Sequence, residues 1–276
     1  MIRSPAALVA DVRPPAVAGR FYPDQPQRLR AAVQEYLAAA RLPDLPGPVR
    51  AVIAPHAGYI YSGPVAGYSF QALPDPAGRT LFLLGPAHFV AVRGVAVATF
   101  AALQTPLGQV ETAPADRLIA SGAGFAPHNA AHLPEHCLEV ELPFLQARAS
   151  GPFRVVPLLF GSEADPAACA AALAPLLSAD PAALVVVSSD LSHYHPYAQA
   201  RRLDTAFLDA VTRGDVAAAT QGEACGRLPI LTLMHLAQAL GWQPRLLDYR
   251  NSGDTAGGRD QVVGYAAVAF LAPLSL

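Results

Sequence analysis

The stretch VRAVIAPHAGYIYSG, from Val49 to Gly63, is the part of the sequence around which the rest of the chain is organised. Its apolar run ends at Ala54 and is too short for an amphipathic helix, which is typical of a strand buried on both faces. His56 follows just past the expected carboxyl end of that strand. In open α/β sheets ligands bind at this edge, because the strands hold the loops above them rigidly. His56 is therefore a candidate ligand-binding residue.

Three other apolar runs also end in polar residues. Thr80–Gly85 precedes PAH (86–88), Ala183–Val187 precedes SSDLSH (188–193), and Arg245–Leu247 precedes DYRNSGD (248–254). The sequence thus brings metal-ligand and acid/base residue types repeatedly to one edge of a predicted sheet.

Composition excludes several classes of function. Of the 276 residues 53% are hydrophobic and 14% are charged, and the net charge is −2, which predicts a large core and no nucleic-acid interface. No run approaches the roughly 20 apolar residues of a membrane span, and Met1–Pro15 is too short and interrupted for a signal peptide. The three cysteines are odd in number and far apart, which is typical of a reducing compartment. We expect a cytoplasmic protein without a membrane or nucleic-acid partner.

Helical patterns separate the expected strands. They cover Pro26–Ala40, Pro64–Leu73, Pro114–Ser121, Pro166–Leu177, Tyr197–Arg213, Asp215–Thr220 and Pro229–Leu240, and further strands are expected at Gly94–Phe100, Val155–Phe160 and Val262–Phe270. Pro5 and the Pro14-Pro15 pair disfavour a helix at the start, so residues 1–13 are expected to form an extended lead-in. Because the chain contains no internal repeat or linker, we predict a single α/β domain over residues 1–276.

His56 and His88 share a sequence context, an apolar strand followed by proline and then histidine. Two neutral imidazoles that leave neighbouring strands would suit a first-row transition metal. The alternative is that each histidine hydrogen-bonds a loop carbonyl. Because the same sequence context occurs twice, we give the metal-ligand and the hydrogen-bonding interpretations about equal weight.

The other candidate residues each have a structural alternative. Asp190 and His193 form a compact acid/base cluster, or a turn in which side chains cap backbone N–H groups. Cys225 lies between Ala224 and Gly226 and is either a thiolate ligand or an apolar filler. Glu135, His136 and Glu139 could support a site, but a solvated face is the expectation that we favour. The sequence contains no phosphate-binding loop, nucleophile elbow or HExxH zinc helix.

The ordered motifs of the chain resemble the Memo family, called AmmeMemoRadiSam system protein B in prokaryotes. The resemblance rests on AVAGRFYP (16–23), APHAGYIYSG (54–63), LGPAH (84–88), TPLG (105–108), EHCLEVELPFL (135–145), SSDLSHY (188–194), ACGRLPI (224–230), YRNSGDT (249–255) and VVGYAA (262–267). It implies a three-layer αβα domain with a mostly parallel central sheet, similar to the class III extradiol, LigB-like dioxygenases.

In those dioxygenases two histidines and a carboxylate hold Fe(II), and another histidine acts as acid/base. By motif, the resemblance implies that His56 and His88 are the imidazole ligands, that Cys225 is the third ligand, and that His193 is the acid/base residue, with Asp190 in the same pocket. Cys225 departs from the dioxygenase carboxylate, and thiolates favour softer metals such as Cu(I) or Zn. Cys137 stands where the family commonly has serine, which could add a second thiol.

The function implied is redox or metal-handling chemistry at a transition metal, with iron or copper expected and zinc as an alternative. A zinc-dependent hydrolase and a non-catalytic module that binds a peptide or phosphorylated ligand are the rival interpretations. Prokaryotic members of the family are linked to radical-SAM and AMMECR-like proteins, which makes such proteins expected functional partners. The substrate, whether a small molecule or a peptide, is not indicated by the sequence.

Overall fold

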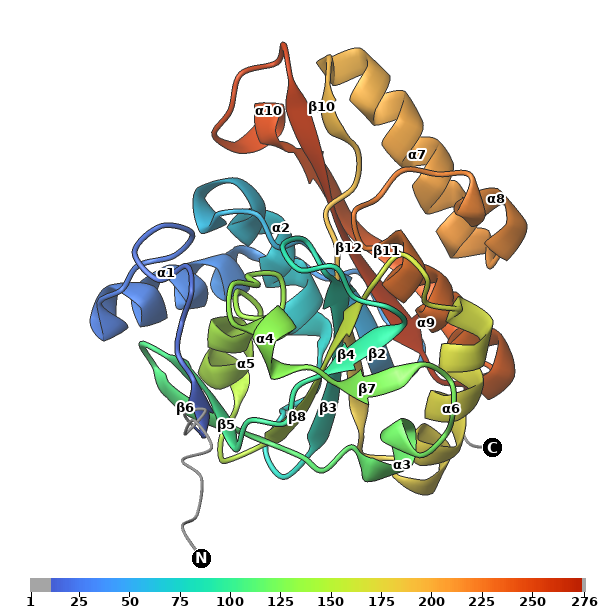
Figure 1. Ribbon diagram of the computed structural model, residues 1–276. Coiled ribbons are helices and arrows are strands. Elements are labelled where there is room, and N and C mark those ends of the chain that lie inside the picture. The colour runs from blue at the N-terminus through green and yellow to red at the C-terminus, as the bar shows by residue number, and fades with distance from the viewer. Residues whose placement is uncertain (1–10, 275–276) are drawn as a thin grey trace, which may run out of the picture.

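The computed structural model describes residues 11–274. The first ten residues of the predicted lead-in, 1–13, lie outside the described residues, and its end forms strand β1 (Val12–Arg13). The strands join one twelve-stranded, mostly parallel sheet, and helices flank it (Figure 1). The predicted α/β class, with a layer of helices on either face of the sheet, is confirmed.

Four parallel strands form the centre of the sheet. In spatial order they are β8 (Arg154–Phe160), β3 (Thr80–Pro86), β9 (Leu184–Ser188) and β2 (Val49–Ala54). Almost every residue of these strands is buried, as their short apolar runs predict for strands covered on both faces. Because the four strands are parallel, their carboxyl ends meet at one edge of the sheet.

Shorter strands extend the sheet on both sides. Beyond β8 lie β6 (Gly108–Thr112), β5 (Ala102–Thr105) and β1, while β4 (Val95–Val97) pairs with β8 and with β7 (Phe125–Pro127). Beyond β2 lies β12 (Val262–Leu271), which pairs antiparallel with both β10 (His193–His195) and β11 (Gln243–Asn251).

Helices cover the two faces of the sheet with separate apolar clusters. On one face pack α1 (Pro26–Ala39), α2 (Tyr59–Ala72) and α5 (Leu142–Arg148), and on the other pack α6 (Pro166–Ala179), α7 (Tyr197–Arg213) and α9 (Arg227–Leu240). The short helices are α3 (Asp116–Ile119), α4 (Asn129–His132), α8 (Val216–Thr220) and α10 (Ser252–Thr255). Within residues 11–274, no helix is long and apolar enough to cross a membrane.

Helix α2 begins at Tyr59, five residues before the predicted start at Pro64, so the Tyr- and Ser-containing segment after His56 belongs to the helix. Gly58 caps its first turn, accepting the N–H groups of Tyr61 and Ser62 at its carbonyl oxygen, and Pro64 lies inside the helix. Gly67 lies against α1, where a Cβ would come within 2.4 Å of the Tyr36 carbonyl oxygen. The close packing of α1 and α2 therefore holds the loop that carries His56.

Other element boundaries also differ from the sequence prediction. Strand β4 spans three residues of the expected Gly94–Phe100, and no helix was predicted at α5, where Pro143 lies in the first turn, a position that favours proline. Strand β11 continues to Asn251, so the polar DYRN segment belongs to the strand itself. A bulge after Leu246 shifts its register against β12.

The sequence predicts that His56 and His88 leave neighbouring strands. In the structure β2 and β3 are not neighbours, so this prediction is wrong. Strand β9 lies between β2 and β3 in the sheet. The segment that follows β9 contains Ser189 and Asp190, so these residues enter the edge between the two histidines. This order places three of the four predicted polar strand exits side by side.

Candidate metal centre

The carboxyl edge of the central strands brings together the three residues predicted as metal ligands. Side-chain atoms of His56, His88 and Cys225 all lie within 4.8 Å of one another. The His56 Nε2 atom is 3.3 Å from Cys225 Sγ, and the His56 and His88 rings are 5.2 Å apart and nearly perpendicular. The three residues come from three separate regions of the chain, so only the fold makes this cluster.

Cys225 reaches the histidines because Gly226 lets its loop approach the end of β9. A Cβ on Gly226 would lie 2.7 Å from the Ser188 carbonyl oxygen and 2.6 Å from Ser189 Cβ. The φ of Gly226 is −91°, so the position needs the absence of a side chain and not a left-handed backbone. Helix α9 begins directly after it. Ser189 Oγ also accepts the Gly226 N–H at 2.9 Å, which fixes the loop to the strand end.

Each histidine has its Nδ1 atom occupied by a neighbouring side chain. His56 Nδ1 is 2.8 Å from Ser188 Oγ, and His88 Nδ1 is 3.0 Å from a carboxylate oxygen of Glu135. Such contacts fix the ring orientation and assign the Nδ1–H tautomer, which leaves the Nε2 lone pair available. The Nε2 atom of His56 is the one that faces Cys225. These two imidazoles are therefore prepared to bind an electrophile at Nε2.

Ser188 belongs to a buried chain of hydrogen bonds beneath His56. Its hydroxyl is 2.8 Å from the Cys137 carbonyl oxygen and 2.6 Å from Glu141 Oε1. Burial raises the pKa of Glu141 well above its usual value, which favours the neutral carboxyl group, and in that form Glu141 can donate to Ser188. Ser188 can then donate to the carbonyl and accept from both Glu141 and His56.

Burial and nearby charge determine the protonation of the other groups at the site. Burial, with an added contribution from Asp190, raises the pKa of the Cys225 thiol to about 12, and burial raises the pKa of Asp190 to about 6. Burial lowers the pKa of His56 well below its usual value. The backbone N–H of Asp190 points at Cys225 Sγ from 3.2 Å. Two imidazoles and a thiol fit a soft or borderline metal, whose charge would displace the thiol proton.

The acidic residues after His132 are buried, which corrects the expectation of a solvated face. Glu135 and Glu139 are only 3% and 2% exposed. Glu135 accepts the backbone N–H groups of His88, His136 and Cys137, besides its contact with the His88 ring. Hydrogen bonds from the His136 and His88 side chains and from the His88 backbone N–H lower the pKa of Glu135 despite its burial. The carboxylate is therefore a charged support for His88.

Glu139 has a different role from Glu135. Its carboxylate pairs with Arg13 and accepts hydrogen bonds from the Val17 N–H and the Tyr22 hydroxyl. These contacts attach the segment after β1 to the site loop. Phe21, in that segment, has its ring 4.9 Å from the His136 ring.

His136 is a site residue, although a solvated face was the favoured expectation for it and for Glu135 and Glu139. Its ring stacks on His88 at 4.9 Å and meets His56 edge-on at 5.4 Å. His88, Glu135 and His136 also have potential ligand atoms within 4.8 Å of one another. We interpret this second group as a hydrogen-bonded support, because Glu135 already accepts four N–H groups. His136 thus forms one wall of the site beside the His/His/Cys cluster.

His193 and Asp190 lie at the site in different ways. Asp190 is buried, and its Oδ1 accepts the His56 backbone N–H at 2.8 Å. His193 is half-buried on β10, where its backbone N–H donates to Glu223. Among the described residues the His193 ring has no hydrogen-bond partner, so Asp190 and His193 do not contact each other through the ring. Beside it, Tyr194 has a left-handed φ of 59°.

Cys137 does not join the ligand cluster. Its side chain is fully buried, and its thiol donates to the Pro86 carbonyl oxygen at 3.2 Å. Burial raises the pKa of Cys137 well above its usual value. Gly85 lies so close that a Cβ there would be 2.7 Å from the sulfur. The second thiol is therefore a packed neutral group beneath the site.

Fold and site together define an α/β protein with a candidate His/His/Cys metal centre at the carboxyl edge of its sheet. The family model described as "Memo-like protein" matches residues 13–269. A "MEMO1 family protein" of Archaeoglobus fulgidus is 38% identical, over 94% of this chain and 99% of the relative. One from Aeropyrum pernix is 36% identical, over 93% of this chain and 99% of the relative. The chain belongs to the Memo family.

A solved structure gives independent support for the fold. An uncharacterized protein from Escherichia coli K12 superposes with a TM-score of 0.53, covering 80% of this chain and 99% of its own. At 15% identity this similarity concerns the fold alone. The predicted resemblance to the Memo family is confirmed by the family model and the sequence relatives, and the α/β architecture by the solved structure.

Proposed function

We propose that this protein binds one first-row transition metal ion through His56, His88 and Cys225 and uses it in redox or metal-handling chemistry. The observation that carries the proposal is the convergence of three ligand atoms within 4.8 Å. The support of both Nδ1 atoms by Ser188 and Glu135 adds to it, because such contacts accompany metal-bound histidines. Iron and copper are the preferred ions, and zinc is the alternative that a thiolate also suits.

The surrounding residues would have distinct tasks. When bound, an ion would supply Lewis acidity and, if it is iron or copper, redox chemistry. Asp190 would hold the His56 backbone through its N–H. His193 would hold or transfer a proton of the substrate, because it is half-exposed at the rim and its ring is not committed to a partner within residues 11–274. A functional link to radical-SAM and AMMECR-like proteins belongs to the same proposal.

Metal reconstitution of the purified protein tests the proposal. We expect about one equivalent of Fe(II) or Cu(I) to bind anaerobically, and oxygen uptake by the loaded protein would support the redox role. Cys225→Ala should lose most of the metal, whereas Cys169→Ala, which removes a buried thiol on α6, should retain it. Circular dichroism confirms that both variants fold. If no ion binds under any anaerobic condition, the site is a ligand-binding pocket without a metal; stoichiometric zinc would favour a hydrolase.

The roles of the histidines can be separated in the same assay. His56→Ala should lose the metal, because it removes a ligand whose Nε2 faces Cys225. His193→Ala should retain it, because three protein ligands on one face leave the remaining positions for substrate. Elemental analysis of the two proteins measures the difference. Equal loss of metal from both variants would contradict the assignment of His193 as an acid/base residue.

A further inference from the structure

A second candidate site lies at the opposite, amino-terminal edge of the central strands. A cleft of about 430 Å³ opens there between α3 and the end of α6. Its floor is two rungs of the β3–β8 ladder, Thr80 opposite Arg154 and Phe82 opposite Val156. Clefts of this size accommodate small molecules. The cleft shares no lining residue with the His/His/Cys cluster, so the two sites can be tested separately.

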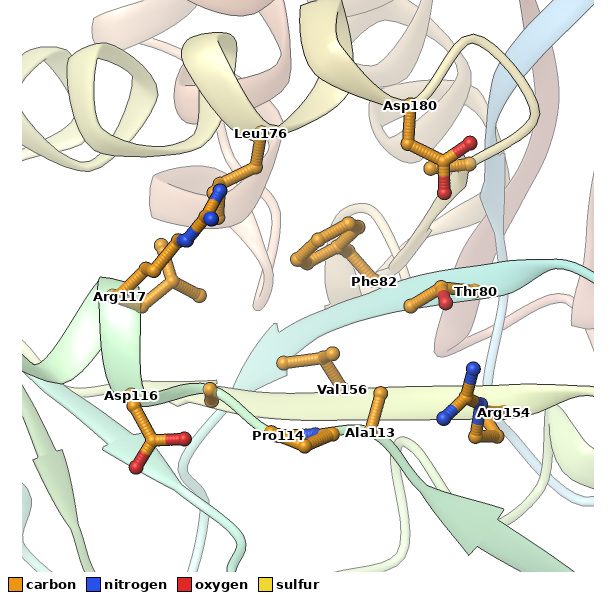
Figure 2. Close-up of a pocket in the computed structure, with 13 residues that line it drawn as sticks. Thr80, Phe82, Ala113, Pro114, Asp116, Arg117, Arg154, Val156, Leu176 and Asp180 are labelled. Atoms are coloured by element: carbon orange, nitrogen blue, oxygen red, sulfur yellow. The ribbon is translucent and has the colours of Figure 1, made fainter.

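The floor of the cleft changes from polar to apolar with depth. Phe82 and Val156 are buried and belong to the core, while Arg154 is exposed at the rim. Leu176 of α6 adds an apolar wall, and Figure 2 shows the Phe82 ring between the walls, facing the cleft. A bound molecule would therefore place an apolar body on Phe82 and its polar groups at the rim.

The rim carries one charge of each sign at the same end. Figure 2 shows Asp180 and Arg154 on opposite walls there, with Arg117 and Asp116 at the other end. Among the described residues, Arg154 and Asp180 form no ion pair with each other or with another side chain. Asp180 Oδ1 accepts the Ala182 N–H, and this hydrogen bond does not involve Oδ2. Both charged groups are thus available to a ligand.

The position of Asp180 strengthens the attraction for a cation. Asp180 directly follows the last residue of α6, and carbonyl groups at a helix carboxyl terminus add partial negative charge. The guanidinium of Arg154 and the Thr80 hydroxyl beside it suit a carboxylate. A simple anion would be repelled by Asp180, and a simple cation by Arg154. A molecule with both charges close together satisfies both groups.

We infer that this cleft binds a free α-amino acid with an apolar or aromatic side chain. Its ammonium group would pair with Asp180, its carboxylate with Arg154 and Thr80, and its side chain would lie on Phe82 and Val156. In an α-amino acid the ammonium group, the carboxylate and the side chain are all attached to one carbon. Both charged groups can therefore reach the rim while the apolar side chain lies on the floor. The inference stands independently of the metal proposal.

Calorimetric titration of the full-length protein with L-phenylalanine tests the inference. We expect saturable binding at one site. N-acetyl-L-phenylalanine, which lacks the ammonium, and L-phenylalaninamide, which lacks the carboxylate, should each bind at least about tenfold more weakly. Glycine should show no saturation, because it has no apolar body. Absence of saturable L-phenylalanine binding, or equal affinity for the three phenylalanine compounds, would overturn the inference.

Single-residue variants test which side chains bind the ammonium and the carboxylate of L-phenylalanine. Arg154→Gln and Asp180→Asn should each weaken L-phenylalanine binding about tenfold, whereas the exposed control changes Arg245→Gln and Asp209→Asn should not. Asp180→Asn should add little to the loss already caused by N-acetylation, because both remove the same ion pair. Thermal unfolding verifies that each variant folds. Unchanged affinity in Arg154→Gln and Asp180→Asn would refute the site, and His56→Ala should bind L-phenylalanine normally even if the metal proposal fails.

Discussion

Ser188 illustrates how a single buried hydroxyl can determine the chemistry of a neighbouring histidine. Its oxygen contacts His56 Nδ1, Glu141 and the Cys137 carbonyl, and it has no exposed surface. Without it, the His56 ring could rotate or adopt the other tautomer, which would direct Nε2–H at Cys225. The contribution of Ser188 is therefore to orientation and not to direct ligation.

We predict that Ser188→Ala lowers metal affinity by about 10- to 100-fold, the range found when groups that orient a ligand histidine are removed. The measurement is a competition titration against a chelator of known affinity. Ser69→Ala is the matched control, because Ser69 is also fully buried and donates to the Ile53 carbonyl of the same strand, β2, that precedes His56. An equal loss of affinity in both variants would indicate a general effect of core hydroxyls.

His132 provides a pH-dependent contribution to stability away from the ligand cluster. Burial lowers the pKa of His132 to about 4, although its Nε2 donates to the Ala96 carbonyl oxygen. In the unfolded chain the same group titrates near its ordinary pKa of about 6.5. Between these values the unfolded state binds the extra proton, so stability present above pH 6.5 is lost as the pH falls towards 4.

We predict that this residue alone removes about 3 kcal/mol of the free energy of unfolding between pH 6.5 and 4, at about 1.4 kcal/mol per pH unit. His132→Gln cannot gain the proton, so its stability should fall less over that range. Urea unfolding of both proteins at several pH values measures the difference between the two curves. Parallel curves would show that His132 has a similar pKa in the folded and unfolded states.

At the scale of elements, the junction of β9 with the start of α9 positions the thiol. Gly226 lies against the backbone of Ser188, and Ser189 Oγ accepts its N–H. The loop and the strand end are therefore one packed unit, and the position of Cys225 depends on the space beside Gly226. Extra volume here cannot be absorbed by a flexible side chain, because a carbonyl oxygen of β9 is among the contacts.

We predict that Gly226→Ala destabilises the protein by about 1–3 kcal/mol and also lowers metal affinity, because the Cys225 loop must move away from β9. Gly214→Ala is the control. Gly214 has a φ of +69° and no atom within 4 Å of an added Cβ, so alanine there costs about 1 kcal/mol through strain alone. Urea unfolding and the chelator competition should show that both variants lose stability but only Gly226→Ala loses metal. Unchanged affinity in Gly226→Ala would mean that the loop adapts.

For the whole molecule, the sequence predicted elements wherever one local pattern dominated. The apolar runs located the four central strands to within about one residue, and α7 was predicted at its observed bounds, Tyr197–Arg213. The order of strands was harder, because which of them lies between β2 and β3 depends on long-range packing. Strand exits and the family resemblance together pointed to the ligand cluster, although Cys225 is 169 residues from His56.

The residues that support the site were missed for a physical reason. Charged side chains are seldom buried without partners, and the partners of Glu135 and Glu139 come from distant parts of the chain. Arg13, for example, is 126 residues from Glu139. A local pattern carries no signal of such pairing. The acidic residues alternate with the buried residues Leu138, Val140 and Leu142, which could have suggested that the segment is enclosed.

A metal ion bound at the His/His/Cys cluster should stabilise the whole fold against unfolding. The three ligands follow β2 and β3 and precede α9, so an ion bound by all three would connect segments that separate on unfolding. At a free metal concentration of 100 times the dissociation constant, binding to the folded state alone should add about 2.7 kcal/mol to the free energy of unfolding. Thermal unfolding of metal-free and loaded protein measures this as a higher midpoint temperature, and chelation should reverse it.

In Cys225→Ala, tested at the same concentration, the shift should largely disappear, since two imidazoles alone bind the ion more weakly. A shift of the same size in the variant would show that the stabilising ion binds elsewhere.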